Sequence, residues 1–383
     1  MKKRPIFYID PQSLRNLSVY DYQLLSGINY DNIWYFHSIY YDHLPIKGVH
    51  QRALFAYNKK GSTLLKALSY IYSYLQIFLY IVRYHPQIIH VQWFKLPAFD
   101  YFFFKIIRYL FRFTLVHTAH NILPHDTGDR YRSVFKKLYK LSDSIIVHTN
   151  KTKSELIQQF SIEPTCISVI PHGLLQLTID QKKLDTYIPQ FKKKYQIEGK
   201  MVFTALGDQT YYKGIDILAK VWASTPELNQ DPNSKLIIIG RNNGLDFSML
   251  EHISNAIIED RRIPNEEFYY ILKHTCVYLL PYIKISQSGA LLTVLGTHTP
   301  VLVSEVGGLT EPLEIAHVGW KIQPNNQFAL QKALIYIQTH PNEIRDIKEN
   351  EDAWRQIEKY YNWESISKQT LAVYQSHSTC YFK

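Results

Sequence analysis

The chain has 383 residues, with 43 Lys and Arg against 33 Asp and Glu and a formal net charge of +10. Hydrophobic residues make up 46% of it, with 15 Gly and 17 Pro, which excludes a disordered or collagen-like protein and allows about two domains with cores of their own. The cysteines Cys166, Cys276 and Cys380 are far apart and form no CxxC, which argues against a disulfide framework or a cysteine zinc site and fits a reducing compartment.

The net charge lies entirely in the first half of the chain. Residues 1–180 hold 21 Lys and Arg against 11 Asp and Glu, and the remaining residues are balanced. Such a basic half can bind nucleic acid, anionic lipid or a phosphorylated substrate, or it can be a solvated basic surface. Nucleic acid is disfavoured because the chain has no RNP, helix-turn-helix or zinc-finger pattern.

In chain order, the first half alternates short apolar runs with helical patterns. The N-terminal segment is too short and too polar for a signal peptide, because Asp10 interrupts its apolar run. We expect helices over 129–141 and 151–160. The expected strands are Ile6–Ile9, Ile88–Gln92, Leu115–Ala119, Ser144–His148 and Ser168–Ile170.

Two stretches of the first half, 62–84 and 96–113, combine apolar residues with many aromatic and some basic ones. In the second, Lys105, Arg108 and Arg112 recur at spacings of three and four, along one helical flank. Aromatic and basic residues together suit the headgroup level of a membrane, so we expect a cytoplasmic protein that binds peripherally to the inner face of the membrane. The alternative is that both helices only cover a sheet.

The second half repeats the alternation of strands and helices. Helices are expected near 214–224, 265–274, 289–296 and 327–339. Two such series predict the α/β class, with two doubly wound, Rossmann-like parallel-sheet domains facing a cleft. We place the domains at 1–173 and 174–362, followed by a last helix over 363–383. The expected strands are Val202–Leu206, Lys235–Ile239, Ile257–Glu259, Val277–Leu280 and Val301–Val303.

A first polar cluster follows a predicted strand in HTAHNILPHD, from His117 to Asp126. Ligands of parallel sheets bind beyond the carboxyl ends of the strands, so His120, Asn121, His125 and Asp126 are candidate site residues. His120 has the chemistry to exchange a proton or to bond a hydroxyl group. Alternatively, this loop only caps the next helix.

Two further motifs lie in the second half. In LGDQTYYKGIDIL, Gly207 follows a strand and Lys213 stands at the start of a helix, a position suited to phosphate, although neither a Walker A loop nor a GxGxxG fingerprint is present. In the segment from Leu280 to Glu311, Ser288 and Gly289 open a helix, and small residues there let backbone N–H groups approach a pyrophosphate.

These blocks together resemble glycosyltransferase family 4, retaining enzymes with the GT-B fold, and the HNILPHD form resembles members that build bacterial exopolysaccharide and capsule. The resemblance runs from about Ile88 to Trp363 and includes VIPHG and KLIIIGR. It implies an N-terminal acceptor domain with His120 as a catalytic residue, and a C-terminal nucleotide-sugar domain with Lys213 as the other. The donor-binding positions that it implies are Gly207, Arg241, Ile263, Ser288, Gly289, Ala290, Leu291 and Thr293.

The resemblance further implies a transferase in cell-surface polysaccharide synthesis, with a nucleotide-sugar donor, a glycan or lipid-linked acceptor, and no cofactor. We expect no metal, since the chain has no Asp-x-Asp, and positive side chains would stabilise the leaving pyrophosphate. The chain departs from the family at its Glu-x7-Glu pair, where Ile285 or Ser286 and Thr293 stand instead. A catalytically silent protein of this fold, or a nucleotide-sugar epimerase, is therefore the alternative.

Overall fold

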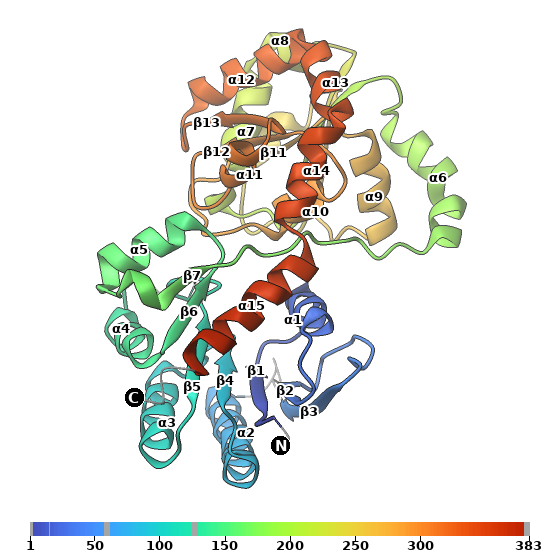
Figure 1. The fold of residues 1–383 in the computed structure, drawn as a ribbon. Coiled ribbons are helices and arrows are strands. Elements are labelled where there is room, and N and C mark those ends of the chain that lie inside the picture. Colours follow the sequence, from blue (N-terminus) through green and yellow to red (C-terminus); the bar gives the residue numbers. More distant parts are fainter. Residues whose placement is uncertain (1–2, 15, 57–61, 125–128, 379–383) are drawn as a thin grey trace. The chain divides into compact units, whose positions relative to one another are not determined.

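The computed structural model describes residues 3–14, 16–56, 62–124 and 129–378, and these form two compact units (Figure 1). Unit 1 comprises Met1–Gly173 together with Tyr361–Lys383, and unit 2 comprises Leu174–Tyr360. Each unit is built around one parallel sheet, which confirms the predicted α/β class with two doubly wound domains.

The sheet of unit 1 has seven strands in the order β3-β2-β1-β4-β5-β6-β7, all parallel. Strands β1, β4, β5 and β6 are buried along their whole length, as expected for a parallel sheet covered on both faces. The strands are β1 (Ile6–Asp10), β2 (Ile33–Ser38), β3 (Val49–Phe55), β4 (Ile88–Val91), β5 (Thr114–Thr118), β6 (Ser144–Val147) and β7 (Ile167–Val169).

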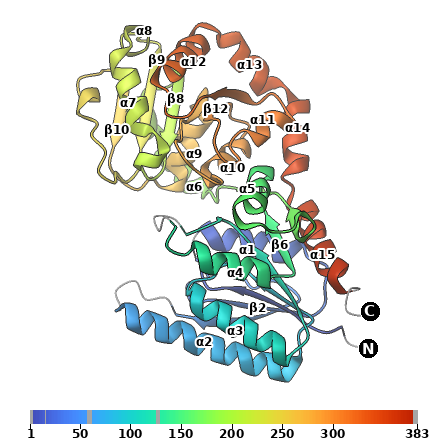
Figure 2. The same cartoon turned by 90° about the vertical axis from the view of Figure 1, so that its left-hand side faces the viewer.

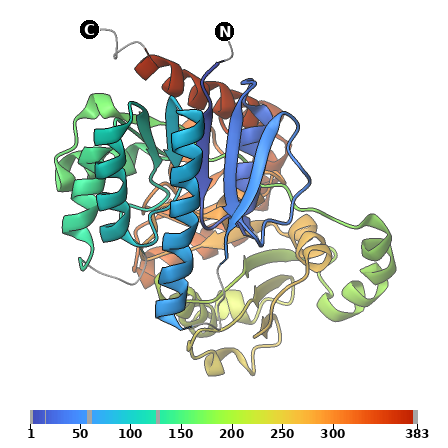
Figure 3. The ribbon, with the colours of Figure 1, turned by 90° about the horizontal axis from the view of Figure 1, so that it is seen from below.

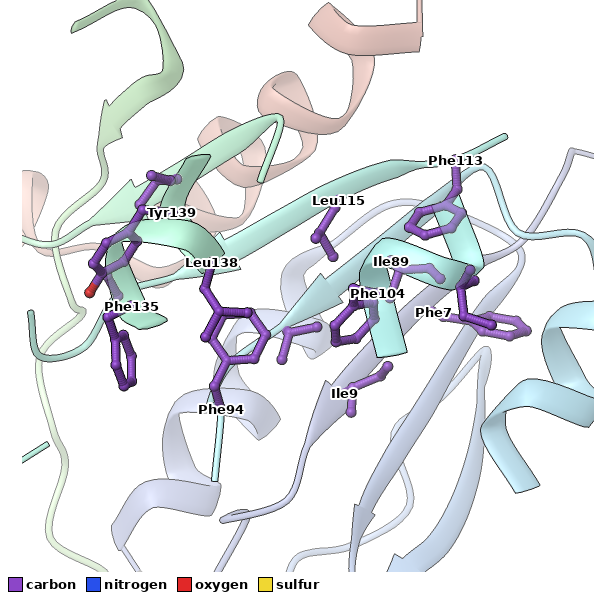
Figure 4. Packing of buried hydrophobic residues seen from close by; sticks show 14 of the residues in the cluster. Phe7, Ile9, Ile89, Phe94, Phe104, Phe113, Leu115, Phe135, Leu138 and Tyr139 are labelled. Atoms are coloured by element: carbon purple, nitrogen blue, oxygen red, sulfur yellow. The ribbon is translucent and has the colours of Figure 1, made fainter. Parts of the chain in front are cut away.

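Helices cover both faces of this sheet. The helices are α1 (Asn16–Gly27), α2 (Thr63–Tyr84), α3 (Pro97–Leu110), α4 (Arg132–Leu141), α5 (Asn150–Phe160) and α15 (Trp363–Ser378), with a short 3-10 turn at Pro164–Cys166. One core lies between the sheet and α2 to α5, and Figure 4 shows the part of it around α3 and α4. The second core lies between the sheet and α1 with α15. Strand β1 shows the alternation, because Phe7 and Ile9 face the first core while Ile6 and Tyr8 face the second.

Helices α2 and α3 lie side by side on one face of this sheet (Figure 2). Tyr74 of α2 packs its ring against Phe99, Phe103 and Phe104 of α3, and Figure 3 shows α2 in front of the strands. Helix α15 packs on α1, and the Ser367 hydroxyl donates a hydrogen bond to the Leu24 carbonyl. The last helix of the chain therefore belongs to unit 1.

The sheet of unit 2 has six parallel strands in the order β10-β9-β8-β11-β12-β13. Its core contains Trp222 of α7 against Phe203 of β8. The strands are β8 (Met201–Leu206), β9 (Ser234–Ile239), β10 (Ala256–Glu259), β11 (Val277–Leu280), β12 (Val301–Ser304) and β13 (Gly319–Ile322). The helices are α6 (Gln181–Tyr195), α7 (Ile215–Ser224), α8 (Pro226–Asn229), α9 (Asn265–His274), α10 (Gly289–Leu295), α11 (Glu311–Ile315), α12 (Gln327–Thr339), α13 (Pro341–Glu349) and α14 (Glu351–Tyr360), with 3-10 turns at Tyr211–Lys213 and Ser248–Leu250.

Each strand that the sequence predicts is present within one or two residues of its expected bounds. Strands β2, β3 and β13 and the helices α1, α6, α8, α11, α13 and α14 were not predicted from the sequence. Both sheets gain edge strands from these additions, while the central strands and their order along the chain stay as expected.

Candidate active site

In unit 1, a cluster of histidines gathers at the carboxyl ends of β4 to β7. His120 lies two residues beyond the end of β5 and is half-buried, with its ring stacked on Trp93 at a centroid distance of 4.8 Å. Its Nε2 lies 2.9 Å from Oε1 of Gln92, and its Nδ1 lies 3.1 Å from Nε2 of His148. Both ring nitrogens of His120 therefore have a partner on a neighbouring strand end.

The tautomers in this cluster follow from a backbone contact. Nδ1 of His148 lies 2.9 Å from the Ile170 carbonyl oxygen, so it carries the proton and Nε2 of His148 accepts a hydrogen bond from His120. Burial, with His148 and His172 nearby, holds the pKa of His120 well below its usual value. His120 is then neutral near pH 7 and carries a single ring proton, which the contact with His148 uses.

His117 differs from His120 as the sequence led us to expect. It lies inside β5, it is buried, and its Nδ1 lies 2.9 Å from the Val91 carbonyl oxygen. Burial lowers the pKa of His117 to about 4, although the bond to Val91 acts in the opposite direction. The side chain is therefore a neutral part of the core, packed against Phe94.

Of the other residues predicted in this loop, Asn121 lies within the described residues. Asn121 directly follows His120 and is half-buried. His125 and Asp126 lie outside the residues that the structure describes.

Several polar residues of this edge escaped the sequence analysis. Gln92, His148 and His172 follow β4, β6 and β7, and Asp10 ends β1. The rule that ligands meet the carboxyl ends of parallel strands, applied to every strand instead of β5 alone, would have found them. The Asp21 carboxylate accepts hydrogen bonds from the buried hydroxyls of Tyr8, at 2.6 Å, and Tyr35, at 2.7 Å.

Asp10 and Asp21 form a buried acidic pair behind this edge. Burial raises the pKa of Asp21 to about 6, although the hydrogen bonds to its carboxylate act against this. Burial and the nearby Asp21 raise the pKa of Asp10 well above its usual value. Within the described ranges, no three His, Cys, Asp or Glu side chains lie together in a way that could hold a metal ion.

In unit 2, Lys213 and Gly207 meet beyond the end of β8. Nζ of Lys213 donates a hydrogen bond of 2.6 Å to the Asp208 carbonyl oxygen, and a side-chain carbon at Gly207 would stand 3.9 Å from that Nζ. Gly214 ends this turn at φ +64°, where a Cβ would meet the Pro281 carbonyl oxygen at 2.1 Å. Burial lowers the pKa of Lys213, and Asp208 raises it.

Asp208 also brings Arg241 to this turn. The Arg241 guanidinium makes two hydrogen bonds to the Asp208 carboxylate, Nε to Oδ1 at 3.0 Å and Nη2 to Oδ2 at 2.7 Å. Gly240 allows the two strand ends to approach, because a Cβ there would meet the Gly207 carbonyl oxygen at 1.8 Å. Two cationic groups, Lys213 and Arg241, are thus attached to the backbone and the side chain of one residue.

The small residues expected to approach a pyrophosphate lie at the start of α10. Ser288 caps this helix, and its hydroxyl accepts a hydrogen bond of 3.4 Å from the Leu291 N–H, so that amide already has a partner. Gly289 and Ala290 occupy the first helical positions, where N–H groups have no partner within the helix. The Thr293 hydroxyl donates to the Gly289 carbonyl oxygen at 2.9 Å, so Thr293 bonds within its own helix.

Ile263 lies apart from these groups, between β10 and α9. It lines a surface hollow together with Arg262, Pro264, Asn265 and Glu266. Of the predicted donor-binding residues, Gly207, Lys213 and Arg241 therefore lie close together around Asp208. Ile263 lines a separate hollow of the same unit.

Comparison with known proteins covers both units. The family model described as Glycosyltransferase Family 4 matches residues 47–174, and the model described as Glycosyl transferases group 1 matches residues 188–354. The chain is 22% identical over 295 residues to a D-inositol 3-phosphate glycosyltransferase of Corynebacterium glutamicum, covering 70% of this chain and 68% of that protein. It is 25% identical over 240 residues to the UDP-Gal:alpha-D-GlcNAc-diphosphoundecaprenol alpha-1,3-galactosyltransferase of Escherichia coli, covering 58% and 59%.

Solved structures show the same fold over the whole chain. Sucrose-phosphate synthase from Thermosynechococcus elongatus has a TM-score of 0.72 at 17% identity, covering 99% of this chain and 100% of that one. HepE from Anabaena in complex with UDP has a TM-score of 0.70 at 13% identity, covering 98% and 100%. Two family models, one on each unit, and this shared fold show that the chain is a glycosyltransferase of the family 4 type, with the GT-B fold.

Proposed function

We propose that this protein transfers a sugar from a nucleotide-sugar to a lipid-linked glycan acceptor in the synthesis of a cell-surface polysaccharide, with retention of the anomeric configuration. The single observation that supports it best is the pair Lys213 and Arg241 held on Asp208 beyond β8. In the net reaction, the bond between C1 of the sugar and the diphosphate oxygen breaks. A bond from C1 to an acceptor hydroxyl oxygen forms, and the hydroxyl proton is released.

Negative charge grows on the diphosphate as it leaves, so the two cations would stabilise the transition state more than the ground state. The UDP bound by HepE and the UDP-galactose donor in the name of the Escherichia coli relative support a nucleotide-sugar donor. We propose that no metal ion is required, because these two side chains supply the positive charge. His120 would act on the acceptor side, with Asn121 next to it, and the resemblance implies acceptor-side roles for His125 and Asp126.

The acceptor named for the Escherichia coli relative is a sugar on diphosphoundecaprenol, which supports an acceptor of this kind here. Product formation by the purified protein tests the proposal. Wild-type protein, a nucleotide-sugar and a polyprenyl-diphosphate-linked sugar should yield a longer lipid-linked glycan. Nuclear magnetic resonance of the new linkage should give the anomer of the donor, and the opposite anomer would contradict retention.

We further propose that unit 1 lies on the membrane surface through α2 and α3. Among the described residues, α2 is the one helix long and apolar enough to cross a bilayer, by length and composition. One face of α2 is buried in unit 1, and its other face exposes apolar side chains, which favours surface binding over spanning. The exposed apolar residues include Leu64, Leu68, Leu75 and Leu79 on α2, and Phe102, Ile106 and Tyr109 on α3.

One part of the sequence-based membrane hypothesis is wrong. Arg108 does not extend from α3 with the other basic residues, because its guanidinium donates to the Asp143 carboxylate at 2.7 Å and to the Leu141 carbonyl oxygen. The helical spacing placed Arg108 on the same flank as Lys105, but this tertiary ion pair holds it against the loop before β6. Lys105 and Arg112 are exposed, and Arg112 lies beyond the end of α3.

Flotation with anionic vesicles tests the membrane proposal. Replacing Leu75 and Leu79 with Gln, together with Lys105→Glu, should move the protein out of the vesicle fraction. Phe328→Gln, which alters an exposed apolar residue of unit 2, should leave flotation unchanged. Raising the salt concentration should weaken only the electrostatic part. Equal flotation of the triple variant and the wild type would contradict the proposal.

A catalytically silent protein of this fold is the second candidate, and Thr293 favours it. The resemblance implies a Glu at this position, whereas the Thr293 hydroxyl is bonded to Gly289 of its own helix. A silent protein would bind a nucleotide or lipid without turnover. Release of nucleoside diphosphate from a donor in the presence of acceptor separates this candidate from the transferase.

A further inference from the structure

Unit 1 contains a cavity whose wall includes neither the histidine cluster nor the proposed donor-binding residues. It lies between the segment after β1, the end of β3, the first turns of α2 and the start of α3, and its volume is about 340 Å³. Ligand pockets typically measure about 300–1,000 Å³, so this one is large enough for a substantial part of a ligand. Its wall includes Pro11, Leu14, Phe55, Ala67, Tyr70 and Leu96.

The wall is mainly apolar, yet it includes two lysines. Lys66 comes from α2 and is half-buried, and Lys95 comes from the segment between β4 and α3 and is exposed. Burial lowers the pKa of Lys95, and the carboxylates of Asp10 and Asp100 lie close enough to act against this effect. Asp100 also accepts hydrogen bonds from the Tyr70 hydroxyl at 2.8 Å and the Leu96 N–H at 3.0 Å. An apolar wall with two ammonium groups is complementary to an apolar chain that carries an anionic group.

The surface next to the cavity fits the apolar chain of such a ligand. The cavity borders the exposed apolar face of α2, since Leu64, Leu65 and Leu68 are exposed beside the lining residues Lys66 and Ala67. A long apolar chain could therefore continue along α2 beyond the cavity. This continuity distinguishes the cavity from an isolated apolar hollow.

Lys95 lies near the same sheet edge as His120. Lys95 is two residues beyond Trp93, whose ring stacks on His120, and Pro11 directly follows the last residue of β1. Because β1, β4 and β5 are parallel neighbours, their carboxyl ends lie at one edge. A phosphate held by the lysines would be at the edge where the proposed acceptor chemistry takes place.

We propose that this cavity binds one molecule of the acceptor lipid, with the first part of its apolar chain against the wall and its diphosphate at Lys66 and Lys95. The proposal rests on the proposed function, which it deepens by giving the acceptor's lipid diphosphate a site of its own. That site is separate from the bilayer-facing side chains of α2 and α3. It does not depend on the identity of the sugar.

Isothermal titration calorimetry with the full chain tests the site, using farnesyl diphosphate as a soluble probe below its aggregation concentration. We expect saturable binding of one probe per chain, at least tenfold tighter than binding of farnesol or inorganic pyrophosphate. Ala67→Phe should fill the cavity and weaken binding at least tenfold. Ala372→Phe, an exposed change on α15, is the matched control and should bind normally.

The lysines are tested separately. Lys66→Gln combined with Lys95→Gln should weaken farnesyl diphosphate binding about tenfold while leaving farnesol binding unchanged. Lys140→Gln, at an exposed lysine of α4, should change neither. If Ala67→Phe fails to fold, normal farnesyl diphosphate binding by the double lysine variant would overturn the proposal.

Three results would overturn the proposal. They are normal binding by a folded Ala67→Phe variant, equally tight binding of pyrophosphate alone, or binding seen only with aggregates or vesicles, which would indicate a surface effect. A thermal shift caused by a nucleotide-sugar, recorded on the same samples, reports on the donor site of unit 2. Failure of the lipid site is thereby distinguished from failure of the proposed transferase function.

Discussion

Lys213→Met removes the ammonium group beyond β8 while keeping most of the aliphatic side chain. The lost group is half-buried and donates a single hydrogen bond of 2.6 Å, to the Asp208 carbonyl oxygen. Losing one stabiliser of developing charge typically costs about 10²–10³ in kcat, or about 2.7–4 kcal/mol. Losing one hydrogen bond of this kind costs the fold about 1 kcal/mol, because the turn itself is held by Gly214 and the backbone.

The assay is release of nucleoside diphosphate at saturating donor, paired with thermal unfolding. We expect kcat to fall about 10²–10³-fold with a shift in Tm of only a few degrees. Lys220→Met is the matched control, because Lys220 is exposed on α7 and pairs with Asp216 only at 3.9 Å. Near wild-type kcat in Lys213→Met, or an equal loss in Lys220→Met, would refute the assignment of Lys213.

Four further predictions follow from the geometry. His120→Ala should reduce transfer far more than His117→Ala when both variants are assayed well below their melting temperatures, and equal losses would contradict the roles given to them. The pKa of His117 is about 4 in the folded protein, below the ordinary histidine value of about 6.5. Its contribution to the free energy of unfolding should therefore fall by up to about 3 kcal/mol as the pH drops from 6.5 to 4. In urea unfolding, the difference in stability between wild type and His117→Gln should be smaller at pH 4.5 than at pH 7.5. A deficit independent of pH would contradict this sign. EDTA should leave the rate of transfer unchanged, and a loss restored by a divalent cation would show that a metal is needed. Gly214→Ala should lower the free energy of unfolding by more than about 1 kcal/mol, because of its φ of +64° and the Pro281 carbonyl, and an unchanged urea midpoint would argue against this turn geometry.

The central strands could be predicted from the sequence because strands buried on both faces are continuous apolar runs. Edge strands and surface helices lack that signal. Strand β3 exposes His50, Arg52 and Ala53, and α6 buries only Leu184 and Tyr195 while containing Pro189, so both resemble loops in the sequence. Their stability comes from tertiary pairing and packing instead of local pattern.

The candidate site could be predicted where its residues are neighbours in the sequence. It could not be predicted where the fold brings distant residues together. Lys213 and Gly214 stand together in the sequence, and the structure shows why glycine is required beside the lysine. The partners of the two ring nitrogens of His120 are Gln92 and His148, each 28 residues away, and no local pattern links them to His120. Arg108 was misassigned for the same reason, because its partner Asp143 lies 35 residues further along the chain.

The measurement that tests the account most directly is donor turnover by the purified protein with membrane vesicles and a polyprenyl-diphosphate-linked sugar, across a panel of nucleotide-sugars. We expect that at least one donor releases its nucleoside diphosphate in step with transfer to the lipid, and that Lys213→Met lowers both signals about 10²–10³-fold. If wild type and Lys213→Met bind a donor equally well and neither turns any donor over, the protein is a silent member of its fold and the transferase account is wrong.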